Sequence, residues 1–153
     1  MKTKSIFKNS IFILFLFLFL NGYSQITHRI TLNVDTGQIT KQTTNQYSNF
    51  GQPQNISNKD YTIEVNVGDY VEWVGVSTTS EDDYVDIESI NHEGGARVFG
   101  KNVLNGSDGV VIAKVTEGRA GDSEKYTIKF RVYVDGEAKP GIFMIDPKIV
   151  IKS

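Results

Sequence analysis

Carboxylate side chains are concentrated in one short stretch of the chain. Five of the eight residues from Glu81 to Glu88 are acidic, and the loop Asn105–Gly109 contributes another carboxylate. Several oxygen ligands in one place are what a hard cation such as Ca²⁺ requires. The candidate calcium ligands are Asp82, Asp83, Asp86 and Asp108.

The spacing within this acidic stretch also has a simpler explanation. Asp86 and Glu88 alternate with Val85 and Ile87, which is typical of a strand whose charged side chains face water. The stretch contains no D-x-[DN]-x-[DN]-G calcium loop. The Gly-flanked spacing of residues 105–109 equally suits a tight turn. We favour a solvated strand face and a turn, with a calcium-stabilised structural or protein-interaction module as the alternative.

Amide side chains are concentrated between Asp35 and Asp60, where few apolar residues occur. Amides offer paired donors and acceptors to hydroxyl groups, and an aromatic ring packs well against the apolar side of a pyranose. The other interpretation is a solvated loop whose aromatic rings fold back on the core, and we favour it because composition alone rarely identifies a ligand. The candidate glycan-binding residues are Tyr47, Phe50, Gln52 and Asn55.

Residues that could perform catalysis are sparse. The only histidines are His28, on the apolar side of an alternating segment, and His92, and neither has a nucleophile beside it in sequence. The triplet Gly121–Ser123 resembles the start of a hydrolase nucleophile block, but the residues that should follow it are absent. We therefore predict a non-catalytic protein with no cofactor other than Ca²⁺. A hydrolase whose site is assembled only in space is the less favoured alternative.

The first 24 residues have the layout of a secretory signal peptide. Lys2, Lys4 and Lys8 precede an apolar run from 11 to 20, and small residues follow at Gly22 and Ser24. A run of ten apolar residues is too short to span a bilayer. The sequence therefore predicts an exported protein, periplasmic or secreted, with a signal peptide at 1–24 and one domain at 25–153.

The charge and the cysteine count exclude several classes of function. Residues 1–24 contain three lysines and no acid, so 25–153 has 13 basic against 18 acidic side chains, a formal charge of −5. An acidic chain without a basic cluster is not suited to nucleic acid or to an anionic membrane surface. The chain has no cysteine, which excludes disulfides, thiolate chemistry and a lipid-anchored N-terminus. The remaining partners are a glycan, another protein or a second copy of the chain.

A hydrophobic period of two recurs through most of the domain. It is clearest from Tyr126 to Val134 and from Ile26 to Val34, and no window shows the apolar stripe of a helix. The sequence therefore predicts an all-β fold, a single antiparallel β-sandwich of about seven to nine strands. The single tryptophan, Trp73, ends an alternating segment and is predicted to be a core residue.

Three blocks of the sequence carry a resemblance to a known family. Leu32–Thr36 is an apolar strand with an Asp-Thr turn, Val67–Trp73 is a Gly-Asp strand ending in Trp, and Gly141–Ile149 is a closing Gly-aromatic block with Asp-Pro. In this order they resemble the AidA/PixA inclusion-body protein family of bacteria. The resemblance implies a compact β-sandwich without established enzymatic activity that self-associates or binds glycans. The chain departs from the family pattern at Ile145, where an aromatic residue is usual, in a shorter first half, and in its signal peptide.

A second resemblance concerns Val65–Trp73, which is similar to the strand that enters the second sheet of cupredoxins, and a terminal β-hairpin after a turn also fits that fold. Cupredoxins hold copper with a cysteine, two histidines and usually a methionine. Because this chain has no cysteine, blue-copper electron transfer is excluded.

Overall fold

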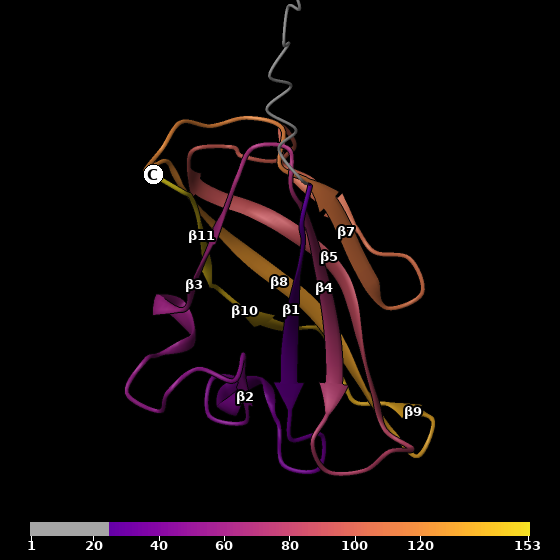
Figure 1. Ribbon diagram of the computed structural model, residues 1–153. Coiled ribbons are helices and arrows are strands. Elements are labelled where there is room, and N and C mark those ends of the chain that lie inside the picture. The colour runs from indigo at the N-terminus through magenta and orange to yellow at the C-terminus, as the bar shows by residue number, and fades with distance from the viewer. Residues whose placement is uncertain (1–24) are drawn as a thin grey trace, which may run out of the picture.

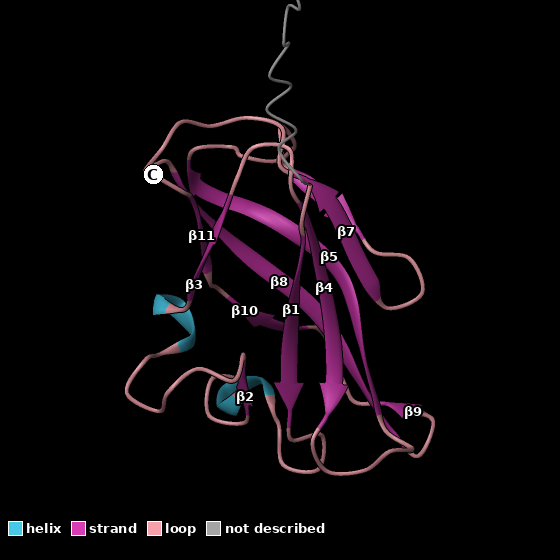
Figure 2. Cartoon of the chain, in the orientation of Figure 1, coloured by secondary structure: helices cyan, strands magenta, loops and turns pink. Residues whose placement is uncertain are grey.

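The computed structural model describes residues 25–153 as an all-β fold with two short 3-10 helices (Figures 1 and 2). The predicted signal peptide, residues 1–24, lies outside the described residues. Among the residues that are described, no helix is long and apolar enough to cross a membrane. The prediction of an all-β fold is confirmed.

The strands form two sheets. The first has the order β2-β1-β4-β7, and the second has the order β3-β11-β8-β5-β6, with β9 and β10 also paired to β8. The first sheet consists of β1 (Thr27–Val34), β2 (Ser48–Asn49), β4 (Tyr70–Ser77) and β7 (Val110–Lys114). The second consists of β3 (Thr62–Val65), β5 (Tyr84–Gly95), β6 (Val103–Asn105), β8 (Ser123–Val134), β9 (Glu137–Ala138), β10 (Phe143–Ile145) and β11 (Lys148–Ile151). The helices are η1 (Lys41–Thr43) and η2 (Asn58–Asp60).

Both sheets are mixed, so the prediction of purely antiparallel pairing is wrong. β1 pairs with β4 in parallel over its whole length, and β11 pairs in parallel with β3. Parallel neighbours need a long connection, and the chain between β1 and β4 supplies one by passing through β2 and β3. The described residues also contain eleven strands rather than seven to nine, because strands of two or three residues are too short to show alternation.

Side chains from both sheets meet in one apolar core around Trp73. Trp73 on β4 is 1% exposed, and its ring packs edge-on against Phe99 and Tyr126 at centroid distances of 5.3 and 5.7 Å. Its indole N–H donates to the Tyr126 hydroxyl on β8 at 3.2 Å. In Figure 1, β1 and β4 lie in front of β8. The prediction that Trp73 is a core residue is confirmed.

Candidate functional site

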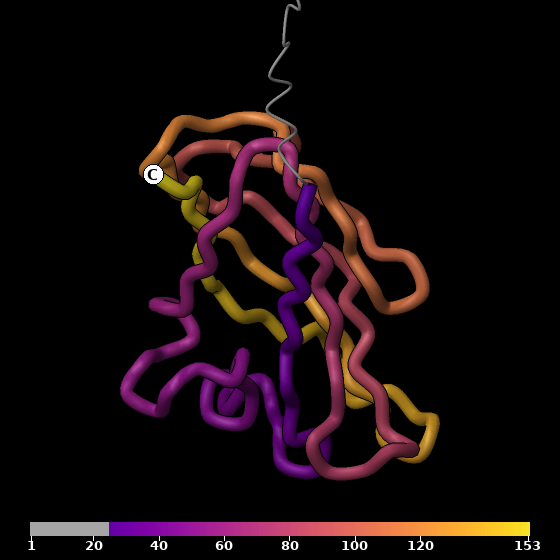
Figure 3. Tube along the Cα trace, in the orientation of Figure 1, coloured from indigo at the N-terminus to yellow at the C-terminus, as the bar shows by residue number. Residues whose placement is uncertain are grey.

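The amide-rich segment between β1 and β3 forms an open hollow on the surface. Figure 3 shows this segment looping beside β1 before the chain rises into β3. The hollow has a volume of about 510 Å³ and we call it the amide hollow. It is lined by Asn45, Gln46, Ser48, Asn49, Gln52, Pro53, Gln54, Ile56, Ser57, Asn58 and Lys59.

Two of the amides in the hollow hold the loop in shape. The Gln52 side chain accepts from the Phe50 N–H at 2.6 Å and donates to the Asn58 amide oxygen at 2.7 Å. Asn58 is buried and donates in turn to the Ser48 carbonyl at 2.8 Å. Buried amides need such partners, so these two are structural. Gln46 and Gln54, by contrast, are exposed and make no side-chain hydrogen bond to another described residue.

The four residues predicted to bind a glycan do not converge. Phe50 is 9% exposed and stacks on Tyr61 at 4.5 Å, and Tyr47 is half-buried against the core. Gln52 lines the amide hollow, and Asn55 is exposed outside it. The aromatic rings therefore fold back on the core, as the solvated-loop interpretation predicted. Sequence reasoning did not single out Gln46 and Gln54, because the composition of the segment does not show which of its amides are exposed and which are bonded within the fold.

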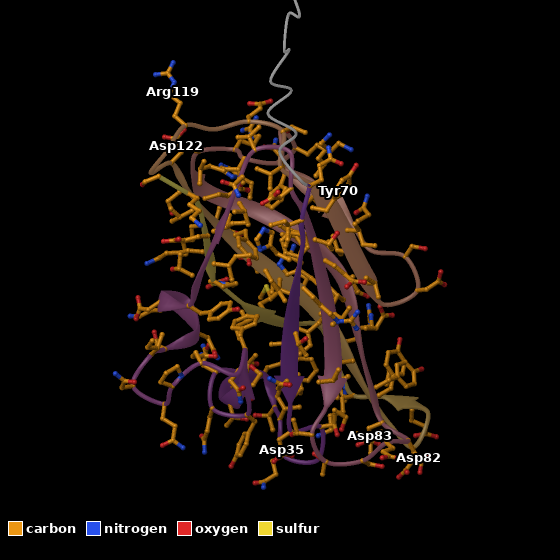
Figure 4. All side chains as sticks on the ribbon, in the orientation of Figure 1. Asp35, Tyr70, Asp82, Asp83, Arg119 and Asp122 are labelled. Atoms are coloured by element: carbon orange, nitrogen blue, oxygen red, sulfur yellow. The ribbon has the colours of Figure 1, made fainter. Side chains whose placement is uncertain are left out.

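The four predicted calcium ligands are also dispersed. Asp83 is 9% exposed and accepts from the Thr36 hydroxyl and from the Asp135 N–H. Asp82 is exposed in the same turn, which lies at the opposite end of the molecule from Asp122 (Figure 4). Asp86 and Asp108 line a different cleft. Within residues 25–153, no three His, Cys, Asp or Glu side chains are grouped so that they could hold a metal ion.

Both histidines are held by buried carboxylates. The Nε2 atom of His28 lies 2.8 Å from Asp69, and Nδ1 of His92 lies 3.0 Å from Glu124. No serine or threonine hydroxyl of the described chain is hydrogen-bonded to either ring. Each histidine therefore ties together two segments that are far apart in the sequence.

Of these two carboxylates, Asp69 accepts the larger number of hydrogen bonds. It is 3% exposed and accepts from the backbone N–H groups of Ile26 and Asn66 as well as from the His28 ring and the Asn66 amide. Burial acts to raise the pKa of Asp69, but these hydrogen bonds outweigh burial and lower that pKa to about 2. The charged form of Asp69 therefore stabilises the turn between β3 and β4.

Glu124 shows the opposite balance. It is 2% exposed and its Oε2 accepts from the Val98 N–H at 2.7 Å. Burial raises the pKa of Glu124, although the hydrogen bonds from His92 and Val98 act to lower it. Neither carboxylate could be distinguished from a surface residue in the sequence.

The fold has been observed before. The crystal structure of the inclusion body protein PixA from Burkholderia cenocepacia J2315 is similar at a TM-score of 0.60 and 14% sequence identity, covering 86% of this chain and 98% of that chain. The resemblance to the AidA/PixA family found in the sequence is therefore confirmed at the level of the fold. The Ile145 departure falls on a core position, since Ile145 is 1% exposed.

Other comparisons give weaker results. The N-terminal domain of phage TP901-1 ORF48 matches at a TM-score of 0.38 and 12% identity, covering 84% of this chain and 100% of that chain. The cysteine protease inhibitor EhICP2 from Entamoeba histolytica matches at 0.30 and 11%, covering 86% and 100%. No family model and no curated protein matches the sequence.

Proposed function

We propose that this protein is an exported, non-catalytic β-sandwich that recognises a glycan at the amide hollow. The observation that carries the proposal is the pair of free amides, Gln46 and Gln54, on a loop that Gln52 and Asn58 hold in place. Amides serve as both donors and acceptors toward hydroxyl groups. Pro53 and Ile56 add apolar surface in the same hollow, and a volume of about 510 Å³ suits a small ligand.

The proposal is tested by screening the purified protein on a glycan array. We expect selective binding that is lost when Gln46→Ala is combined with Gln54→Ala, because each replacement removes one free donor and acceptor pair. Gln38→Ala is the matched control, since Gln38 is an exposed amide outside the hollow. All variants should keep the melting temperature of the wild type, because none of these side chains makes a hydrogen bond to another residue within 25–153.

A chelator included in the same screen tests the calcium alternative. Because no three His, Cys, Asp or Glu side chains of the described residues are grouped so that they could hold a metal ion, we expect the array signal and the melting temperature to be the same with calcium and with chelator. A signal that depends on calcium would favour the calcium-stabilised alternative. An empty array in both conditions would contradict the glycan proposal.

The open edge of β1 favours self-association as a second candidate. From Thr27 to Leu32, β1 pairs only with β4, because β2 covers only the last two residues of β1. An uncovered strand edge can pair with another chain. The similar solved protein from Burkholderia cenocepacia is described as an inclusion body protein. Sedimentation velocity should then show larger species as the protein concentration rises, and a monomer at every concentration would contradict this candidate.

A further inference from the structure

A second cleft lies beside β4 at the point where its pairing with β7 stops. The last paired residues are Val74 and Val110, so Gly75–Ser77 are paired only with β1, on the other side. The turn before β7 folds away toward β5, where the Ile87 N–H donates to the Gly109 carbonyl at 3.1 Å. The space left open has a volume of about 740 Å³, and we call it the acidic cleft. Part of its wall is therefore an unpaired stretch of strand edge.

Apolar and aromatic side chains form part of the lining of the acidic cleft. Val76 is 36% exposed and lines the cleft together with Val74 and Val110. Tyr84 is 49% exposed and stacks on Tyr133 of β8, with ring centroids 4.2 Å apart and an interplanar angle of 11°. This stacking holds the Tyr84 ring in one orientation, so the ring is preorganised for a ligand.

The lining of the acidic cleft also carries an excess of negative charge. Asp86, Glu88 and Asp108 line it, together with Arg29. Both nearby guanidinium groups are already engaged, because Arg29 pairs with Glu72 at 2.9 Å and Arg131 pairs with Glu88. Counting Glu72 with the three lining carboxylates, four negative charges therefore stand against the two positive charges of the guanidinium groups.

Two of these carboxylates are available to a ligand. The Asp86 carboxylate makes no hydrogen bond or ion pair with another residue of the described chain, and the Asp108 carboxylate accepts only from the Ser107 hydroxyl at 3.2 Å. A neutral sugar would leave the excess negative charge of the cleft unbalanced. Since the described residues contain no metal-holding group here, a metal ion would lack ligands.

We propose that the acidic cleft binds an extended, lysine- or arginine-bearing segment of a partner protein. The peptide backbone pairs with the unpaired edge of β4 at Gly75–Ser77, as in strand addition to other sheets. A basic side chain lays its apolar stem against Val76 and the Tyr84 ring and places its charge at Asp86 and Asp108. The apolar side chains match the stem of the basic residue, the strand edge matches the peptide backbone, and the excess of carboxylates matches the positive charge.

Fluorescence anisotropy with a short labelled peptide in which Lys and Val alternate tests this proposal. We expect saturable binding that weakens with salt, because charge pairing contributes to it. Combining Asp86→Asn with Asp108→Asn should weaken binding by about tenfold or more. Asparagine preserves the shape of both side chains and tolerates the positive φ of 52° at position 108, so the variant should fold normally.

A matched control removes the same number of charges elsewhere. Glu64→Gln combined with Glu117→Gln changes two exposed residues outside the cleft and should leave peptide binding unchanged. Equal weakening by both double variants would overturn the proposal, because the attraction would then be a property of the net charge. Equal binding of a Glu-Val peptide would overturn it as well.

Two further arms distinguish a peptide site from a small-amine site and from the amide hollow. Cadaverine supplies the ammonium group without a peptide backbone, and competition as effective as that of the unlabelled peptide would overturn the peptide proposal in favour of a small amine. The Gln46→Ala, Gln54→Ala variant should bind the peptide normally, because the amide hollow is a separate site. The peptide result therefore stands or fails independently of the glycan result.

Discussion

Replacing Trp73 with alanine is expected to lower the free energy of unfolding by about 3 to 5 kcal/mol. The side chain fills the centre of the core, where it contacts Phe99 and Tyr126. Its loss leaves a cavity between the two sheets and removes the hydrogen-bond partner of the buried Tyr126 hydroxyl. Urea unfolding should be followed by far-UV circular dichroism, because the replacement removes the only tryptophan of the chain.

A double-mutant cycle separates the hydrogen bond from the packing. Trp73→Phe keeps a ring in the core but removes the indole N–H, and Tyr126→Phe removes the acceptor. The coupling between the two changes should be about 1 kcal/mol, the usual net value of a hydrogen bond. If Trp73→Ala kept the stability of the wild type but lost binding to a glycan, Trp73 would be a ligand contact and its assignment to the core would be wrong.

The sequence predicted which residues face the core much better than it predicted which strands are neighbours. The period of two from Tyr126 to Val134 falls within β8, and Tyr126, Ile128, Phe130 and Val132 are all fully buried. Alternation of apolar and polar residues shows which face of a strand is buried, because successive side chains point to opposite faces. It carries no information on strand direction, so the parallel pairing of β1 with β4 could not be predicted from it.

The candidate sites were less predictable for a related reason. The amide hollow occurs in the segment that composition indicated, but Phe50 turns inward to stack on Tyr61 while Gln46 and Gln54 turn outward. An irregular loop has no fixed period from which these directions could be inferred. The acidic cleft depends on where β7 begins along β4, which is a matter of strand register.

Replacing Asp69 with alanine is expected to lower the free energy of unfolding by about 3 kcal/mol, because the hydrogen bonds that Asp69 accepts are lost. The replacement removes the buried carboxylate that accepts from the His28 ring and from the N–H groups of Ile26 and Asn66. Glu72→Gln is the control, because Glu72 pairs with Arg29 near the surface and such a pair contributes less than about 1 kcal/mol. Equal loss of stability in both variants, measured by urea unfolding, would contradict the special role of Asp69.

Acid titration of stability tests the same carboxylate through its charge. The pKa of Asp69 is about 2 in the folded protein, below the ordinary value of about 4 that it has in the unfolded chain. Its stabilising contribution is therefore fully present above about pH 4 and is lost as the pH falls toward 2. Asp69→Asn has no such group, so the difference in unfolding free energy between wild type and Asp69→Asn should shrink over this window. A difference that stays constant from pH 5 to pH 2 would show that the charge of Asp69 does not stabilise the turn, since every other titrating group is common to both proteins.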